Sequence, residues 1–153
     1  MPASGAWASR EAAWRSLGKT YVWQASAAQL VSVNTGNLEG RFKRLVVLLD
    51  KTASASIAGD TCDIYLDTSI DAGTTWLNAA HFPQLLGNGS SVKYWCVFDA
   101  SAPGTAPIVV TADCAVNTVR PYLMGALWRV RTVIVNGGGT HSFTYAITAF
   151  GQL

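Results

Sequence analysis

The chain has 153 residues, of which 50% are hydrophobic and 13% are charged, and its formal net charge is +2. This length fits one domain with a sizeable core, and the composition excludes a disordered polyelectrolyte and a broad basic surface for specific nucleic-acid binding. The longest apolar run, around residues 45–49, is far shorter than the roughly 20 residues of a membrane-spanning helix, so no membrane partner is expected.

Residues 1–20 are predicted to form an extended arm in front of a single domain at residues 21–153. Trp7 and Trp14 are seven positions apart, so a short amphipathic helix would carry both on one face. Large aromatic rings are costly to leave in water, which favours an assembly arm that docks on a neighbour over an unattached terminus. The arm lacks the continuous apolar stretch of a secretory signal, which predicts synthesis in a cytoplasm.

From Tyr21 onward the hydrophobic period changes to two, with β-branched and aromatic residues between clusters of Gly, Asn, Ser and Pro. The pattern predicts strands over residues 21–33, 41–50, 54–57, 61–68, 75–82, 92–98, 107–112, 126–135 and 141–150. Short strands without helices between them favour an all-β fold, an antiparallel β-sandwich that is jelly-roll-like or closely related.

Two of these segments carry specific expectations about burial. Residues 41–50 begin with basic side chains and continue as an apolar run, which predicts a central strand that is covered on both faces beyond its start. In residues 61–67 apolar side chains alternate with polar ones, which predicts a half-buried strand. Its other face, with Asp63 and Asp67, is expected to be solvated.

The clearest hairpin is expected near the carboxyl end of the chain. Residues 126–135 and 141–150 both alternate in hydrophobicity, and the glycine-rich segment 136–139 between them suits a turn. Further turns are predicted at 34–37 and 87–90. We therefore expect the last two strands to pair with each other.

Four carboxylates lie close together in the sequence, at Asp60, Asp63, Asp67 and Asp71. They lack the spacing of a calcium-binding loop, and Asp63 and Asp67 on one strand face would be about 13–14 Å apart. His81 and His141 are not accompanied by a recognisable nucleophile motif, and neither glycine-rich turn resembles a phosphate loop. We expect no catalytic, cofactor-binding or metal-binding residues, and no enzymatic activity.

The three cysteines are Cys62, Cys96 and Cys114. Their odd number and irregular spacing are unlike a disulfide framework or a zinc site. We expect them to be buried free thiols.

Five basic residues on two strands could approach each other: Arg41, Lys43, Arg44, Arg129 and Arg131. Trp95, Tyr122 and Trp128 could add rings on which nucleic-acid bases stack. Charges on strand edges also discourage unwanted sheet pairing. We favour that second role, so no specific nucleic-acid partner is expected.

The sharpest local motif is the segment 69–76, Ser-Ile-Asp-Ala-Gly-Thr-Thr-Trp. It resembles the Asp-box of sialidases and other β-propellers, S-x-D-x-G-x-T-W, at Ser69, Asp71, Gly73, Thr75 and Trp76. Asp71 can accept backbone N–H bonds, Gly73 can take a positive φ and Trp76 can pack against a hairpin. In those propellers the motif recurs from blade to blade, away from the catalytic centre. Its single occurrence here predicts a structural turn and no sialidase activity.

The longer segment 67–82, which contains this motif, also resembles segments in small structural proteins of tailed bacteriophages. The resemblance implies a virion component. The favoured role is that of a capsid decoration protein that binds the major capsid protein or other virion proteins as a homo-oligomer. A tail or connector protein is the alternative within this class. The implied location is the virion, after synthesis in the host cytoplasm.

Two other functions compete with the virion role. A carbohydrate-binding module is motivated by the Asp-box-like turn, the sandwich fold and aromatic rings that can stack on sugars, so a glycan partner stays open. A hydrolase would need acid, base or nucleophile groups that the sequence does not identify.

Overall fold

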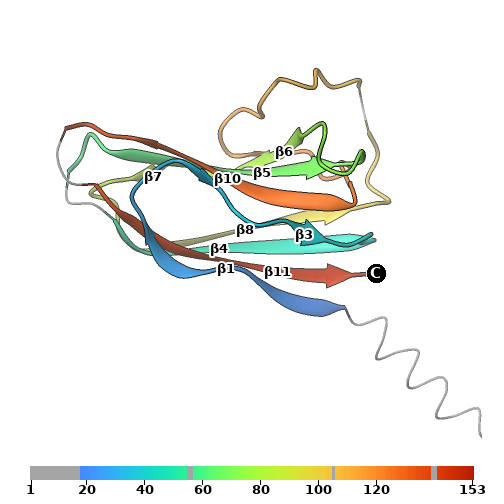
Figure 1. Cartoon of the computed structure of the whole chain (residues 1–153), viewed down its shortest axis with the longest axis horizontal. Helices are drawn as coiled ribbons and strands as arrows, with labels where there is room; N and C mark the ends of the chain where they lie inside the picture. Colours follow the sequence, from blue (N-terminus) through green and yellow to red (C-terminus); the bar gives the residue numbers. More distant parts are fainter. Residues whose placement is uncertain (1–17, 55–56, 105, 139–140) are drawn as a thin grey trace, which may run out of the picture.

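The structure is a computed structural model, and it describes residues 18–54, 57–104, 106–138 and 141–153. These residues form an all-β sandwich of two antiparallel sheets stacked face to face (Figure 1), which confirms the predicted fold class. Residues 1–17 of the predicted assembly arm, with Trp7 and Trp14, lie outside the described residues, and residues 19 and 20 belong to β1. Among the residues that are described, no helix is long and apolar enough to cross a membrane.

The described strands are β1 (Lys19–Gln29), β2 (Val33–Asn34), β3 (Leu38–Glu39), β4 (Arg44–Ser54), β5 (Thr61–Ser69), β6 (Leu77–His81), β7 (Leu85–Leu86), β8 (Val92–Asp99), β9 (Thr118–Val119), β10 (Leu127–Val135) and β11 (Phe143–Gln152). One sheet has the order β1-β11-β4-β8. The other follows β2-β10-β5-β6-β9, with β3 on β10 and β7 on β5.

This strand order is that of a jelly roll. When β2 and β3 are counted together as the second principal strand, strands 1, 8, 3 and 6 form one sheet and strands 2, 7, 4 and 5 form the other. The chain therefore crosses repeatedly from one sheet to the other. Among the described pairings, β5 and β6 are the one pair of consecutive strands that hydrogen-bond to each other, so the Asp-box-like turn closes a local hairpin.

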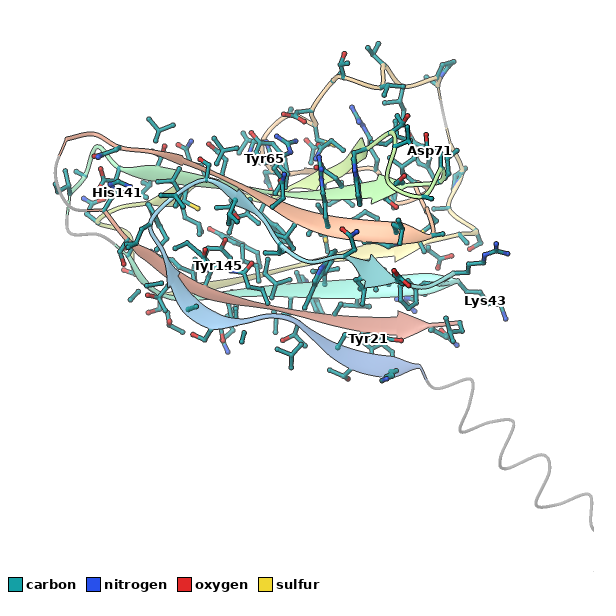
Figure 2. All side chains as sticks on the ribbon, viewed as in Figure 1. Tyr21, Lys43, Tyr65, Asp71, His141 and Tyr145 are labelled. Atoms are coloured by element: carbon teal, nitrogen blue, oxygen red, sulfur yellow. The ribbon has the colours of Figure 1, made fainter. Side chains whose placement is uncertain are left out.

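The core lies between the two sheets and is filled by the inward-facing residues of both. Figure 2 shows Tyr145 on β11 pointing into this space, where its hydroxyl lies 2.6 Å from the hydroxyl of Thr132 on β10. Burial raises the pKa of Tyr145, so the phenol stays neutral. Phe98 and Trp128 also meet across the core, with ring centroids 4.8 Å apart. Each buried ring of this size stabilises the sandwich by about 1.5–3 kcal/mol.

The predicted hairpin between the last two strands is wrong. β10 pairs with β5, where Val130 faces Leu66, and β11 pairs with β4, where Ile147 faces Leu49. The two strands belong to opposite sheets. Alternating hydrophobicity shows which side of a strand is buried, but it does not show which strand is its partner.

Several predicted strand limits also differ from the structure. Residues 107–112 form no strand, although they are rich in β-branched residues, because this segment arches over the outside of the seven-stranded sheet (Figure 1). In the predicted strand 54–57, Ser54 is the end of β4 and Ile57 lies in no strand. β1 begins two residues before the predicted start at Tyr21.

Candidate interaction surface

The outer face of the four-stranded sheet is formed by alternate residues of β1, β11, β4 and β8. One row across the sheet consists of Val22, Thr148, Leu48 and Trp95. The neighbouring row consists of Thr20, Phe150, Val46 and Val97. We call these two rows the apolar face, since they contain six apolar side chains, two threonines and no charge.

Four of the eight residues of the apolar face are exposed and the other four are half-buried. Val22 and Trp95 are 73% and 76% exposed, at the two edges of the sheet, and Phe150 is 40% exposed between them. No described segment covers the outer side of this sheet in Figure 1. Contiguous exposed apolar surface commonly marks an interaction site.

Charged residues border the apolar face at both ends of the strands. At one end the Lys93 ammonium lies 3.0 Å from the Asp50 carboxylate. At the other end Arg44 faces Asp99 in the register of β4 and β8. Hydrogen bonds from Ser101 lower the pKa of Asp99, so this carboxylate stays charged. A partner on the apolar face would therefore meet an apolar centre with a charged rim.

β4 links this surface to the sequence pattern. Leu45, Val47 and Leu49 are fully buried against the other sheet, as predicted for a central strand. Val46 and Leu48 point the opposite way and are only partly buried. The sequence predicted cover on both faces of β4, and the described residues cover one.

The outer face of the seven-stranded sheet is different, because its polar groups bind one another. Asp67 on β5 is buried and accepts hydrogen bonds from Arg129 Nε at 3.1 Å and Arg131 Nε at 3.0 Å, both on β10. Asp113 also pairs with the Arg131 guanidinium. Burial works to lower the pKa of Arg131, but hydrogen bonds to Asp67 and Asp113 outweigh it and raise the pKa.

Aromatic rings stack on the same two arginines. The Arg129 guanidinium lies 4.4 Å from the centroid of the Trp76 ring, and that of Arg131 lies 4.1 Å from the Tyr65 ring. Tyr65, which Figure 2 shows on the side of its sheet away from the core, also stacks on His81 at 4.1 Å. We call this set the polar ladder: Asp67, Arg129, Arg131, Trp76, Tyr65 and His81.

The segment between β8 and β9 covers part of the polar ladder. Besides the contact of Asp113 with Arg131, the carbonyl oxygen of Cys114 lies 3.2 Å from His81 Nδ1. The N–H of Cys114 donates to Asn78 Oδ1 at 2.7 Å, which holds the segment on β6. The ladder is thus a cross-linked and partly covered surface.

The Asp-box-like turn lies where β5 passes into β6. Asp71 Oδ1 accepts the N–H of Thr75 at 2.8 Å and the hydroxyl of Ser69 at 2.8 Å. The N–H of Gly73 donates to Ser69 Oγ at 2.9 Å, and Gly73 has a φ of +87°. Trp76 lies against Gly73 and under the Arg129 guanidinium. The acceptor role of Asp71 and the positive φ of Gly73 are as the sequence predicts.

Hydrogen bonds within this turn keep the Asp71 carboxyl group ionised. The N–H of Thr75, then the hydroxyls of Thr75 and Ser69, lower the pKa of Asp71 below its ordinary value of 3.8. The carboxylate is therefore ionised at neutral pH and satisfied within the turn, which is a structural arrangement and not that of a general acid.

The predicted solvated face of Asp63 and Asp67 is wrong. Asp67 is held in the ladder, and Asp63 Oδ1 lies 3.0 Å from His81 Nε2 on β6. Asp60 is fully buried and accepts the N–H of Gly137 at 2.8 Å. These carboxylates have partners from distant parts of the chain, which the sequence pattern did not reveal. Within the described ranges, no group of three or more His, Cys, Asp or Glu residues could hold a metal ion.

The predicted basic residues do not form one patch. Arg129 and Arg131 belong to the ladder, whereas Arg44 lies on the other sheet, at the border of the apolar face. Trp128 is fully buried and donates from Nε1 to the Gly125 carbonyl at 3.1 Å, so it offers no stacking surface. Of the three rings considered for base stacking, Trp95, Tyr122 and Trp128, Trp95 is the most exposed.

The cysteines are free and buried, as predicted. Burial, and for Cys62 also the charge of Asp63, raises the pKa of Cys62 and Cys96 to about 12. Burial also raises the pKa of Cys114. All three thiols are therefore protonated and poorly reactive at neutral pH.

A buried lysine, which the sequence analysis did not identify, fixes the predicted turn at 87–90. Lys51 Nζ donates to the carbonyl oxygens of Gly89 at 2.6 Å and Ser90 at 2.9 Å. Burial lowers the pKa of Lys51. Its ammonium is used to hold the turn onto β4.

Of the residues in the apolar face, Trp95 is the one that the sequence indicated as an exposed ring. The outward residues of this face, such as Val46 and Phe150, alternate with core residues along the same strands. The continuous apolar run of β4 was interpreted as a strand buried on both sides, and the alternation of residues 141–150 as one half of a hairpin.

Comparisons of the chain with protein-family models, curated proteins and solved structures return no match.

Proposed function

We propose that this chain is a non-enzymatic structural component of a bacteriophage virion, most simply a capsid decoration protein. The observation that carries the proposal is the apolar face, because an exposed apolar sheet face in a rigid sandwich suits attachment to other protein. The resemblance of residues 67–82 to phage structural proteins is the reason for proposing a virion protein. In this role the chain is made in the host cytoplasm and binds the major capsid protein or other virion proteins as a homo-oligomer.

The polar ladder supports a structural role on independent grounds. Its Asp67 carboxylate pairs with both guanidinium groups, Asp113 pairs with one of them from outside the ladder, and aromatic rings stack on the same guanidinium groups. Such a network fixes β5, β6 and β10 relative to one another. A decoration protein benefits from this rigidity, because less conformational freedom is lost when it binds.

Co-sedimentation with undecorated capsids tests the proposal. The full chain should sediment with the particles in a saturable manner, and Val22→Asp should lower the affinity by about tenfold or more, since it places a charge in the apolar face and weakens the contacts between chains on which attachment depends. Ile70→Asp is the matched control, because Ile70 is 75% exposed but lies on the Asp-box-like turn. Absence of particle binding by the full chain, or equal losses in both variants, would contradict the proposal.

The same apolar face could serve in a tail or connector. Separation of heads from tails before immunodetection would distinguish the two positions. A decoration protein should be found with heads that lack tails, at many copies per particle. Recovery with isolated tails would move the assignment to the alternative.

The exposed Trp95 favours one further candidate, a carbohydrate-binding module. An exposed indole ring on a flat sheet can stack on a sugar ring. A glycan array with the full chain tests this function, and Trp95→Ala should abolish any binding that depends on the ring. Reproducible glycan binding that is lost in this variant would favour the module over a purely structural role.

A further inference from the structure

We propose that the apolar face is covered by residues 1–17 of a second copy of the chain, so that two copies exchange their amino-terminal arms. The inference rests on the proposed function, since it names one partner of the surface on which that function depends. It joins two observations: an amino-terminal segment with two tryptophans on one predicted helix face, and a sheet face whose apolar side chains have no described cover.

The arm joins the domain at the border of this face. Gly18 precedes β1, an edge strand of the four-stranded sheet. Its backbone is so close to β11 that a Cβ atom at Gly18 would lie 2.9 Å from Phe150 Cζ and 2.6 Å from the Gly151 carbonyl oxygen. Phe150 belongs to the apolar face, so Gly18, to which residues 1–17 are joined, lies next to that surface.

A helical arm is long enough to cross the whole width of the sheet. Four strands about 4.8 Å apart place β1 and β8 about 14 Å from each other. A helix of 17 residues would be about 25 Å long, and its Trp7 and Trp14 would be about 10 Å apart, which is close to two strand spacings. Such a helix would place its two indole rings on separate strands of one apolar face.

The buried area favours exchanged arms over direct contact of two sheet faces. The two rows measure about 14 Å across and two residue pairs along the strands, which is too little for a stable dimer on its own. Two tryptophans bury about 300–500 Å². With a comparable area on the apolar face and two such contacts per dimer, the total is about 1,200–2,000 Å², the usual size of a stable interface.

A twofold axis would limit the exchange of arms to two copies of the chain. In a pair related by a twofold axis, with the two apolar faces toward each other, each Gly18 lies at the border of the shared space. Each arm then covers the partner's face, and the contact closes at two copies. The proposed virion role favours this source of the arm, because an arm folded onto its own domain would hold no neighbour.

Complementation between two variants of the full chain provides the test. The arm variant carries Trp7→Ser and Trp14→Ser, and the face variant carries Val22→Asp and Trp95→Ser. Sedimentation equilibrium should show a dimer for the original chain, with a dissociation constant raised by about tenfold or more in either variant. A mixture of the variants should recover dimer, because an intact arm of one can cover an intact face of the other. Ile70→Asp should dimerise like the original chain.

Three results would overturn the exchange: a monomeric original chain, a dimer that neither variant weakens, or a mixture with no more dimer than its components. A monomeric original chain would also point to an arm that covers its own face. Particle co-sedimentation of the same samples separates this inference from the proposed function. Dimers that do not bind capsids contradict only the virion role, and capsid binding by a monomer contradicts only the exchange.

Discussion

The two outer faces of this sandwich differ in how their side chains are satisfied. On the seven-stranded sheet, Asp67 and its arginine partners satisfy each other, and the segment before β9 covers part of them. On the four-stranded sheet, Val22 and Trp95 are left open to solvent. The first face contributes to the stability of the folded chain, and the second is available for contact with another chain.

Removal of the central carboxylate should have the largest effect on stability. Asp67→Ala leaves Arg129 and Arg131 without their shared buried partner, and we expect a loss of about 3–5 kcal/mol in the free energy of unfolding. Urea denaturation measures this loss. Asp113→Ala removes an exposed partner of Arg131 and should cost less than about 1 kcal/mol. Equal costs for the two substitutions would mean that the ladder does not stabilise the sheet.

The Asp-box-like turn should show the next largest effect. Gly73→Val forces a β-branched side chain into a positive φ and should cost about 1–3 kcal/mol. Ala72 also has a positive φ, of 58°, so Ala72→Gly should leave stability unchanged or slightly higher. Thermal unfolding of both variants tests the turn. A Gly73→Val chain that is as stable as the original would contradict the structural role of the motif.

Substitutions in the apolar face should hardly change the free energy of unfolding. Val22→Asp and Trp95→Ser change exposed side chains, and we expect each to alter the free energy of unfolding of the monomer by no more than about 0.5 kcal/mol. Urea denaturation at a protein concentration well below the dimer dissociation constant gives this value. A loss as large as that of Asp67→Ala would show that the two faces do not differ in the proposed way.

The smallest effect should be a pH dependence of the stability that the Asp-box-like turn contributes. The folded-state pKa of Asp71 is lowered, so the stability that its carboxylate contributes is complete above the ordinary value of 3.8 and is lost as the pH falls through the folded pKa. The difference in melting temperature between the original chain and Asp71→Asn should therefore be constant above about pH 5 and shrink below about pH 4. A difference that does not change with pH would show that the ionised carboxylate is not what holds the turn.

The sequence was sufficient for features that depend on neighbours along the chain. Alternation within β5 gave its inward residues, and the spacing of Asp71 and Gly73 gave the turn that joins β5 to β6. These features follow from local backbone geometry, because side chains alternate along a strand and a positive φ favours glycine.

Features that depend on distant strands were not predictable in the same way. Alternation in β10 and β11 is as regular as in a hairpin, yet a jelly roll places them in opposite sheets. The partners of Asp67 come from β10, more than sixty residues later in the chain, and only the register of β5 with β10 brings them together. The double-sided apolar pattern of β4 predicted burial on both faces, and the second cover is what the exchange of arms would supply.

Electron cryo-microscopy of the full chain bound to capsids would test the central claim most directly, since it shows which sheet makes the contacts between chains. We predict that Val22 and Trp95 are buried at such a contact, while the polar ladder faces solvent or its own covering segment. A map in which the four-stranded sheet is open to solvent and the seven-stranded sheet forms the contacts would contradict the account.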